Sequence, residues 1–136
     1  MIDVHTTVRT FLLANEGLAA LVPAARVFAG RNEPPPGYAP GSDGPCVVFK
    51  TRGGAGTYRG RDYEDALLVP SMQFKCYGAS EVQAYQVYRA LADALHGGRG
   101  ASVLHAEEAG IGQPLEEPDT EWRFVLSFFD VMVRSA

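Results

Sequence analysis

Residues 72–95, MQFKCYGASEVQAYQVYRALADAL, change from one periodicity to another within a single stretch. The first six residues alternate between apolar and more polar side chains, which is the period of a β-strand. From Ser80 the apolar period is helical, Ser80 and Gln83 occupy the positions of a capping box, and Gly97 and Gly98 end the helix. The predicted buried stripe of this helix comprises Val82, Tyr85, Tyr88, Leu91, Ala92 and Leu95. The stretch therefore predicts a strand that leads directly into a helix.

The sequence on either side predicts a second main helix and further strands. Asp3 is a candidate N-cap for a helix that precedes a short helical turn ending at Pro23. The apolar stripe of that helix consists of Val4, Val8, Phe11 and Leu12. The predicted strands span residues 26–29, 46–51, 66–77, 101–106 and 122–133. Pro70 lacks an amide hydrogen, so we expect it at a bulge or an edge position. The pattern predicts a single α+β domain over residues 1–136, with two main helices packed on an antiparallel or mixed sheet.

Length and composition are those of an ordinary soluble domain. The chain has 136 residues, of which 46% are hydrophobic and 21% are charged, enough to build one hydrophobic core. The N-terminal sequence predicts no secretion signal, and no apolar run reaches the ~20 residues of a membrane span. We therefore expect no membrane partner.

The charges are distributed unevenly along the chain. Residues 1–61 carry seven Lys/Arg and four Asp/Glu, a balance of +3, whereas residues 62–136 carry five and twelve, a balance of −7. The net charge of −4 disfavours nucleic-acid binding, which depends on phosphate neutralisation by Lys and Arg. A molecule of two signs is suited to ordered association with copies of itself or with partners.

Residues 51–66, TRGGAGTYRGRDYEDA, are predicted to form a long loop in which basic residues precede acidic ones. This order favours contact with a second copy, because opposite halves of two such loops can pair. The candidate subunit-contact residues are Arg52, Tyr58, Arg59, Arg61, Asp62 and Glu64. The glycines also fit a small-ligand or nucleotide-binding enzyme, but this alternative is disfavoured because the segment lacks the phosphate-loop lysine and no helix opens directly after it.

Residues 107–121 hold six acidic residues and no basic one, and Gly and Pro interrupt them, so a second exposed loop is predicted there. The candidate acidic contact residues are Glu107, Glu108, Glu116, Glu117 and Asp119. Their spacing does not match an EF-hand. A solvated loop and a contact with a basic neighbouring surface both remain open. Residues 30–45 contain five prolines and four glycines, which predicts a third loop.

The remaining chemistry-bearing residues form no recognisable motif. Cys46 and Cys76 lie in predicted strands outside any CxxC pair, which predicts buried free thiols. His5, His96 and His105 are scattered along the chain. No Ser-His-Asp, Cys-His or HExxH arrangement is readable. The sequence therefore predicts a protein that is not an enzyme and has no catalytic residue, metal or cofactor.

Four segments in succession resemble one family. They are VRTFLLANEGLAALVPAARVFAG (8–30), PPPGYAPGSDGPCVVFK (34–50), MQFKCYGASEVQAYQVYRALADAL (72–95) and WRFVLSFFDVMVR (122–134). In element order and length the chain resembles the tail-completion, or tail-terminator, proteins of long-tailed bacteriophages and related prophages. The resemblance covers nearly the whole chain, and its best-matching part is YGASEVQAYQVYRALADAL (77–95).

This resemblance implies a structural virion protein. Such proteins form a ring, expected to be a hexamer, that caps the tail tube, stops its polymerisation and joins it to the head-side connector. The implied partners are other copies of the chain, the tube protein and the connector or neck protein, with DNA passing through the ring. The implied location is the virion tail or neck, after synthesis in the host cytoplasm. Another neck or tail component, such as a head–tail connector or a tube subunit, is the alternative.

Overall fold

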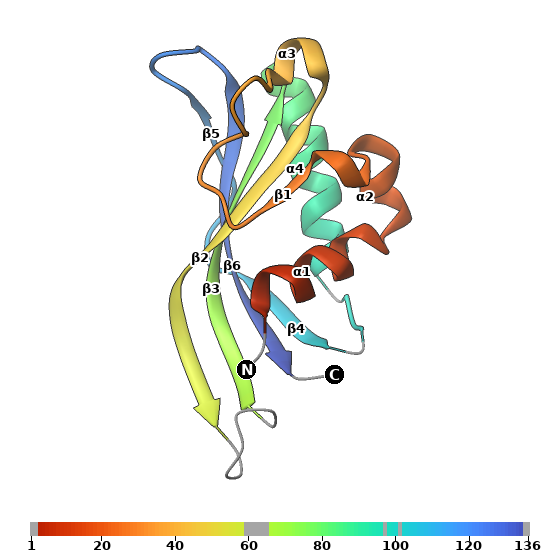
Figure 1. The fold of residues 1–136 in the computed structure, drawn as a ribbon, viewed down its shortest axis with the longest axis vertical. Coiled ribbons are helices and arrows are strands. Elements are labelled where there is room, and N and C mark those ends of the chain that lie inside the picture. Colours follow the sequence, from red (N-terminus) through yellow and green to blue (C-terminus); the bar gives the residue numbers. More distant parts are fainter. Residues whose placement is uncertain (1–2, 59–65, 97, 101, 135–136) are drawn as a thin grey trace.

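The computed structural model describes residues 3–58, 66–96, 98–100 and 102–134. The helices are α1 (Val4–Leu13), α2 (Glu16–Leu21), α3 (Pro40–Asp43) and α4 (Glu81–Leu95), with a short 3-10 turn, η1 (Ala24–Arg26). The strands are β1 (Val27–Ala29), β2 (Cys46–Tyr58), β3 (Ala66–Gly78), β4 (Val103–Glu108), β5 (Gln113–Glu116) and β6 (Arg123–Arg134). They form one sheet in the order β1-β2-β3-β6-β4, with β5 also paired to β6 (Figure 1). Because β1 and β2 are parallel and the other pairs antiparallel, the sheet is mixed and the predicted α+β class is confirmed.

The two main helices begin where the sequence predicts. The Asp3 carboxylate accepts a hydrogen bond from the Thr6 amide at 3.1 Å, and the Ser80 hydroxyl accepts one from the Gln83 amide at 3.2 Å. The Gln83 side chain in turn accepts a bond from the Ala79 amide at 2.7 Å. These bonds satisfy amides that have no partner within the first helical turn.

The buried face of α4 differs from the predicted stripe. The buried residues are Ala84, Val87, Leu91, Ala94 and Leu95, whereas Val82 is 69% exposed. The start of α4 lies close against the end of β3: a Cβ added at Gly78 would lie 2.6 Å from the Ala84 amide nitrogen. Gly78 allows this close approach, and the helix is oriented so that Ala84 and Val87 face the sheet near its start while Val82 faces outward.

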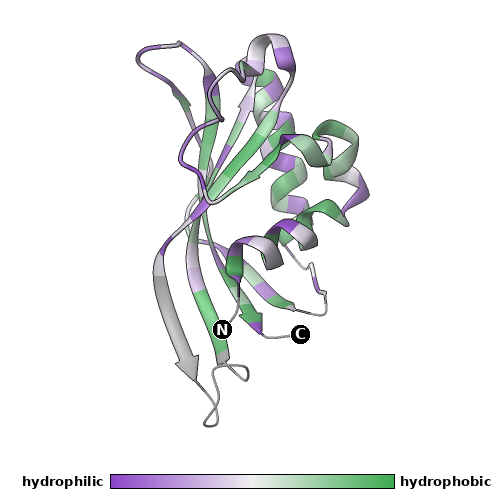
Figure 2. Ribbon diagram, viewed as in Figure 1, coloured by the Kyte–Doolittle hydropathy of each residue, from purple (hydrophilic) through white to green (hydrophobic). Residues whose placement is uncertain are grey.

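The main core lies between α1, α2, α4 and one face of the sheet, where Figure 2 shows hydrophobic residues on both layers. Its fully buried members include Val8, Leu12, Leu18, Phe49, Phe74, Leu91, Leu95 and Phe129. Phe74 occupies the middle of an aromatic row, with its ring centroid 5.4 Å from that of Phe49 and 5.7 Å from that of Phe129. Burial of these rings supplies much of the driving force for folding.

A smaller core lies on the opposite face of the sheet. Cys46, Val48, Tyr77 and Phe124 are buried there. Tyr38, Leu115 and Trp122 pack against them. β6 is therefore apolar on both faces, since Phe124 packs in this smaller core and Phe129 in the main one. The sequence predicts a loop at residues 30–45, which cover this core, but the segment contains the helix α3. It is fixed by a 2.7 Å hydrogen bond from the Tyr38 hydroxyl to the Gly44 carbonyl.

Two predicted loops contain strands. β2 continues to Tyr58 and pairs with β3 as far as Ala66, so the loop prediction for residues 51–66 is wrong over 51–58. The loop prediction for 107–121 is wrong at residues 107–108 and 113–116. Glu107 and Glu108 end β4, and residues 113–116 form β5. Glycine, proline and acidic residues disfavour strands only weakly, and pairing with a neighbouring strand overrides them.

Pro70 lies where the pairing is irregular, as expected. The register of β2 against β3 shifts between Thr51 and Gly54, and Gly54 stands opposite Pro70. The pairing of β3 with β6 is interrupted between Leu68 and Ser71, since proline has no amide hydrogen to donate.

Candidate assembly surfaces

The paired arms of β2 and β3 project beyond the helices. β1 reaches only as far as Phe49 along β2, and below that point the hairpin extends away from the body of the molecule (Figure 1). At the base of this projection the His5 imidazole accepts a 3.3 Å hydrogen bond from the Thr51 amide. Gly53 then adopts a φ of 88°, a left-handed conformation that favours glycine.

Of the six candidate subunit-contact residues, the structure describes Arg52 and the backbone of Tyr58. Arg52 is exposed at the base of the projecting arm, and its guanidinium lies over the Phe128 ring, 5.1 Å from the centroid. Tyr58 is the last residue of β2. Arg59, Arg61, Asp62 and Glu64 lie outside the described residues. The contact prediction at these positions therefore remains a prediction.

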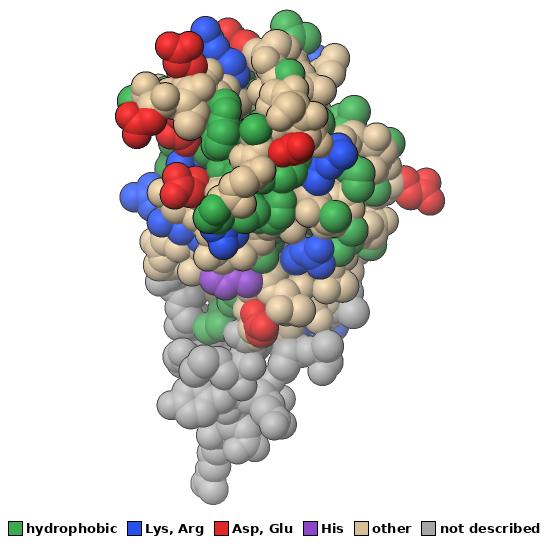
Figure 3. All heavy atoms as spheres, turned by 45° about the horizontal axis from the view of Figure 1, so that its top comes forward, with side chains coloured by type: hydrophobic (Ala, Val, Ile, Leu, Met, Phe, Trp, Pro, Cys, Tyr) green, Lys and Arg blue, Asp and Glu red, His purple; other side chains and the backbone are tan. Residues whose placement is uncertain are grey.

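The five candidate acidic contact residues divide into two groups. Glu107, Glu116 and Asp119 are exposed. Glu107 lies 3.2 Å from the His105 ring and Glu116 lies 3.4 Å from the Arg123 guanidinium. Figure 3 shows acidic side chains gathered at the upper left, over the turn between β5 and β6. The contact prediction at Glu107, Glu116 and Asp119 remains a prediction.

Glu117 and Glu108 instead stabilise the fold, a role that the sequence did not reveal. Glu117 accepts a 2.8 Å hydrogen bond from the Tyr77 hydroxyl and lies 3.7 Å from the Lys75 ammonium. The Lys75 ammonium also lies 5.1 Å from the centroid of the Phe124 ring. These contacts fix the acidic turn to the second face of the sheet, because they join it to β3 and β6.

Glu108 joins α4 to the end of β4. It accepts a hydrogen bond from the Tyr88 hydroxyl, and its second oxygen lies 3.4 Å from the His96 ring. The Tyr88 hydroxyl also accepts a 3.0 Å hydrogen bond from the Gly112 amide. A Cβ at Gly112 would lie 2.5 Å from the Tyr88 ring, so only glycine allows this approach. Tyr88 is thus a core-edge residue, as predicted, and it positions the turn that leads into β5.

Tyr88 is expected to ionise near pH 12 in the folded protein. Burial, and then the hydrogen bond to Glu108, raise the pKa of Tyr88 to about 12, against about 10 in an unfolded chain. Because the folded pKa is the higher one, this stabilisation is complete below about pH 10 and is lost as the pH rises through the folded value.

An ultraviolet titration of phenolate measures this ionisation. Burial also raises the pKa of Tyr38 to about 12, so at least two phenols should ionise late, and Tyr88→Phe should remove one of them. Ionisation of all six tyrosines near pH 10 while the protein stays folded would contradict the account.

The cysteines and histidines are placed apart from one another. Both thiols are free and buried, as predicted. Burial raises the pKa of Cys46 to about 12 and raises that of Cys76 further. Each histidine has its own partner, which is the Thr51 amide for His5, Glu108 for His96 and Glu107 for His105. Within the described ranges, no three His, Cys, Asp or Glu side chains are grouped so that they could hold a metal ion.

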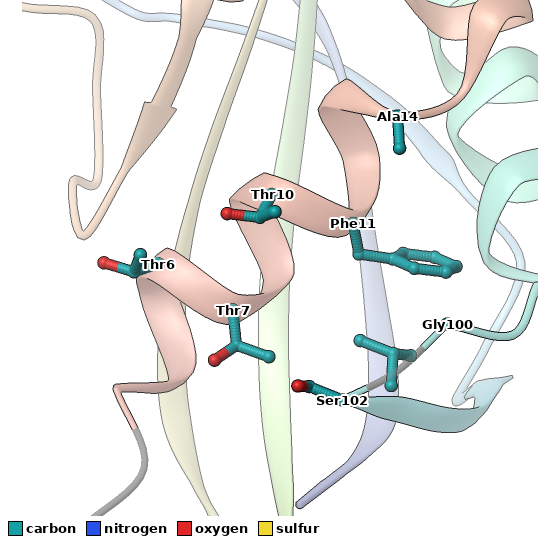
Figure 4. Close-up of a pocket in the computed structure, with 8 residues that line it drawn as sticks. Thr6, Thr7, Thr10, Phe11, Ala14, Gly100 and Ser102 are labelled. Atoms are coloured by element: carbon teal, nitrogen blue, oxygen red, sulfur yellow. The ribbon is translucent and has the colours of Figure 1, made fainter. Parts of the chain in front are cut away.

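A groove of about 340 Å³ runs between α1 and the segment that leads into β4 (Figure 4). It is lined by Thr6, Thr7, Thr10, Phe11, Ala14, Gly100, Ser102 and Val103. Its lining is apolar apart from hydroxyls, and the Thr6 hydroxyl already donates to Asp3 at 2.7 Å. These groups can offer hydrogen bonds and apolar contact, but none of them titrates near neutral pH.

Comparison with known proteins identifies the fold. No protein-family model matches the sequence, and no curated protein sequence matches it. Thirteen chains of solved structures do match. One is a chain from the virion of a native gene transfer agent particle, with a TM-score of 0.59, 20% sequence identity, and coverage of 93% of this chain and 90% of that one.

This chain shares the fold of that virion chain. The two correspond over almost their full lengths. Among the residues that the structure describes, no helix is long and apolar enough to cross a membrane.

Proposed function

We propose that this chain is a structural subunit of a phage-like virion and that it acts as a tail terminator. In this role, copies form a ring, most simply a hexamer, that caps the tail tube, stops its growth and joins it to the head-side connector. The observation that carries the proposal is the end-to-end likeness to a chain of a gene transfer agent virion. The sequence resemblance to tail-completion proteins agrees with it.

The distribution of charge supports a ring built by self-association. In a ring each subunit meets the next through two different faces. The β2 side of the sheet carries Lys50 and the exposed Arg52, whereas the β4 and β5 side carries the exposed Glu107, Glu116 and Asp119. Exposed pairs contribute about 0–1 kcal/mol each. Such pairs would orient neighbouring subunits, and apolar area at the interface would supply most of the affinity.

The tube protein and the connector are the proposed partners, and the virion neck is the proposed location. Another neck or tail component is the second candidate, because the virion chain with this fold is described by its particle and not by its position. A connector or a tube subunit would also assemble through heterologous contacts. Tail length distinguishes the two candidates. Loss of a terminator leaves the growth of the tube unchecked, which loss of a connector does not do.

Reversal of the charges of Arg59 and Arg61, the candidate contact residues of the sequence, tests the proposal in particles. The variant Arg59→Glu/Arg61→Glu is expected to give tails of abnormal length or tails without heads, because misoriented subunits cannot close the ring that stops tube growth. Electron microscopy of particles measures the tail length. Arg89→Glu, at an exposed position on α4, is the control and should leave tails normal. Normal tails and normal head attachment in the double variant would count against the proposed contact.

A further inference from the structure

Two strand edges in the part of the sheet below β1 lack a neighbouring strand among the described residues. β1 pairs with Val47–Phe49 of β2, so the part of β2 beyond Thr51 has β3 on one side only. At the other end of the sheet, β4 pairs with β6 and is the last strand in the order. Exposed strand edges offer unpaired amides and carbonyls to another chain.

The two free edges lie at the same level of the sheet. Glu108 of β4 is in one cross-strand row with Phe129, Met72 and Thr51. Val103, at the other end of β4, is in one row with Val133, Leu68 and Gly56. Residues 103–108 therefore span the same rows as residues 51–56. A copy turned about an axis parallel to the strands would bring one edge beside the other without a shift along them.

The strand directions allow such a contact to continue the sheet. From β2 across to β4 every neighbouring pair is antiparallel, so β4 runs opposite to β2. In a copy related by rotation about such an axis, β2 keeps its direction, so it would meet β4 as an antiparallel partner. The ladder between the two copies would then be of the same kind as the ladders inside the sheet.

The charges of the edges favour this pairing over the alternatives. Arg52 stands at the start of the free part of β2, in the irregular stretch between Thr51 and Gly54. Glu107, with its side chain 75% exposed, is in one row with Asp130 and Ser71, and Ser71 lies opposite this stretch. Two β2 edges would bring arginines together, and two β4 edges would bring glutamates together. Like charges directly opposite one another destabilise a strand pair, and opposite charges stabilise it. The combination of β2 with β4 avoids both repulsions.

We propose that neighbouring copies join by strand addition, with the free part of β2 in one copy pairing with β4 of the next. The inference rests on the proposed function, since it describes how the ring of that function would be held together. Main-chain hydrogen bonds would supply affinity, and Arg52 with Glu107 would fix the register. Each copy uses both of these edges, so in a closed ring the free part of β2 and the edge of β4 are paired in every copy.

Two main-chain amides of β4 are free to bond to the next copy in this arrangement. Ala109 donates its amide to the Phe128 carbonyl at 2.8 Å, in the same register that pairs Glu107 with Asp130. Because bonding alternates along an antiparallel ladder, the amides of Ala106 and Glu108 point away from β6. These two amides should acquire partners when a second copy docks, whereas the amide of Glu107 is already bonded within the subunit.

Hydrogen exchange of the assembled ring on tail tubes, compared with the isolated subunit, tests the inference. Exchange of residues 103–108 and 52–58 should slow by about tenfold or more, because the opening of an edge would then require breaking intersubunit bonds. A ring that forms with unchanged exchange in both segments would overturn strand addition and leave the proposed function standing. Failure of any ring to form on tubes would overturn the proposed function and this inference together.

A charge exchange tests the register of the same contact. Arg52→Glu and Glu107→Arg should each reduce ring formation at least about tenfold, which corresponds to ~1.4 kcal/mol. The combined variant should restore the ring, since the opposite pair is rebuilt with reversed sign. Circular dichroism confirms that each variant folds, and Arg89→Glu serves as a control that assembles normally. Two defective single variants that the combination fails to rescue would contradict the pairing of these residues.

Discussion

Truncation of Phe74 to alanine is expected to lower the free energy of unfolding by about 4 kcal/mol. The side chain is fully buried, and its ring packs between those of Phe49 and Phe129 under the helices. The variant loses the transfer free energy of the ring and also leaves a cavity, because two rigid neighbours cannot collapse into the space. Urea unfolding followed by circular dichroism measures the loss.

The matched control is Ile111→Ala. This isoleucine is 92% exposed, so removal of its side chain should change the free energy of unfolding by less than about 0.5 kcal/mol. If Phe74→Ala were as stable as this control, the aromatic row would not be the centre of the core, and the packing described for α4 and β3 would be wrong.

Substitution of Gly78 by valine should have the next largest effect, a loss of about 3 kcal/mol. A Cβ at this position would lie 2.6 Å from the Ala84 amide nitrogen and 2.9 Å from the Gln83 carbonyl carbon. Both atoms belong to the backbone at the start of α4, so relief of the clash requires that the whole helix move away from β3. The same movement would loosen the contacts of Leu91 and Leu95 with the sheet.

The Gly110→Val variant controls for the loss of glycine itself. No atom lies within 4 Å of a Cβ at Gly110, so a change below about 0.5 kcal/mol is expected in the same urea experiment. Equal effects at the two positions would mean that backbone freedom, and not the close approach of α4, explains the requirement for glycine at position 78.

The features that the sequence predicts best are those determined locally. Asp3 and Ser80 each cap a helix through a bond to an amide three residues later, so nearby residues suffice to place the start of α1 and α4. The strand predicted at 122–133, which is β6 in the structure, is likewise indicated by the residues of one continuous segment. Both interpretations are confirmed.

Features that depend on a distant partner could not be read from the sequence. The strand character of 51–58 comes from pairing with β3, and that of 113–116 comes from pairing with β6. The buried face of α4, with Ala84 and Val87 buried and Val82 exposed, depends on how the helix packs against β3, which brings its first turn close to Gly78. In each case tertiary contact outweighs composition and local preference.

The sequence predicted only part of the candidate site, because the rest depends on contacts between residues far apart in the chain. The sequence marks Arg52 and the exposed acidic residues as charges, but only the sheet order places them on opposite edges. It also groups Glu108 and Glu117 with the surface acids, although Tyr88 and Tyr77 bind them inside the subunit. Hydrogen bonds between residues 20 and 40 positions apart leave no periodic signal in the sequence.

The central claim is that this chain works by closing a ring of identical subunits on the end of a tail tube. Negative-stain electron microscopy of the purified protein, with and without growing tail tubes, tests it most directly. If this chain is a tail terminator, a ring of copies should be seated on one end of each tube, and the tube should not lengthen further once the ring is in place. Tubes that keep growing with no ring at either end, at protein concentrations sufficient to saturate them, would contradict it.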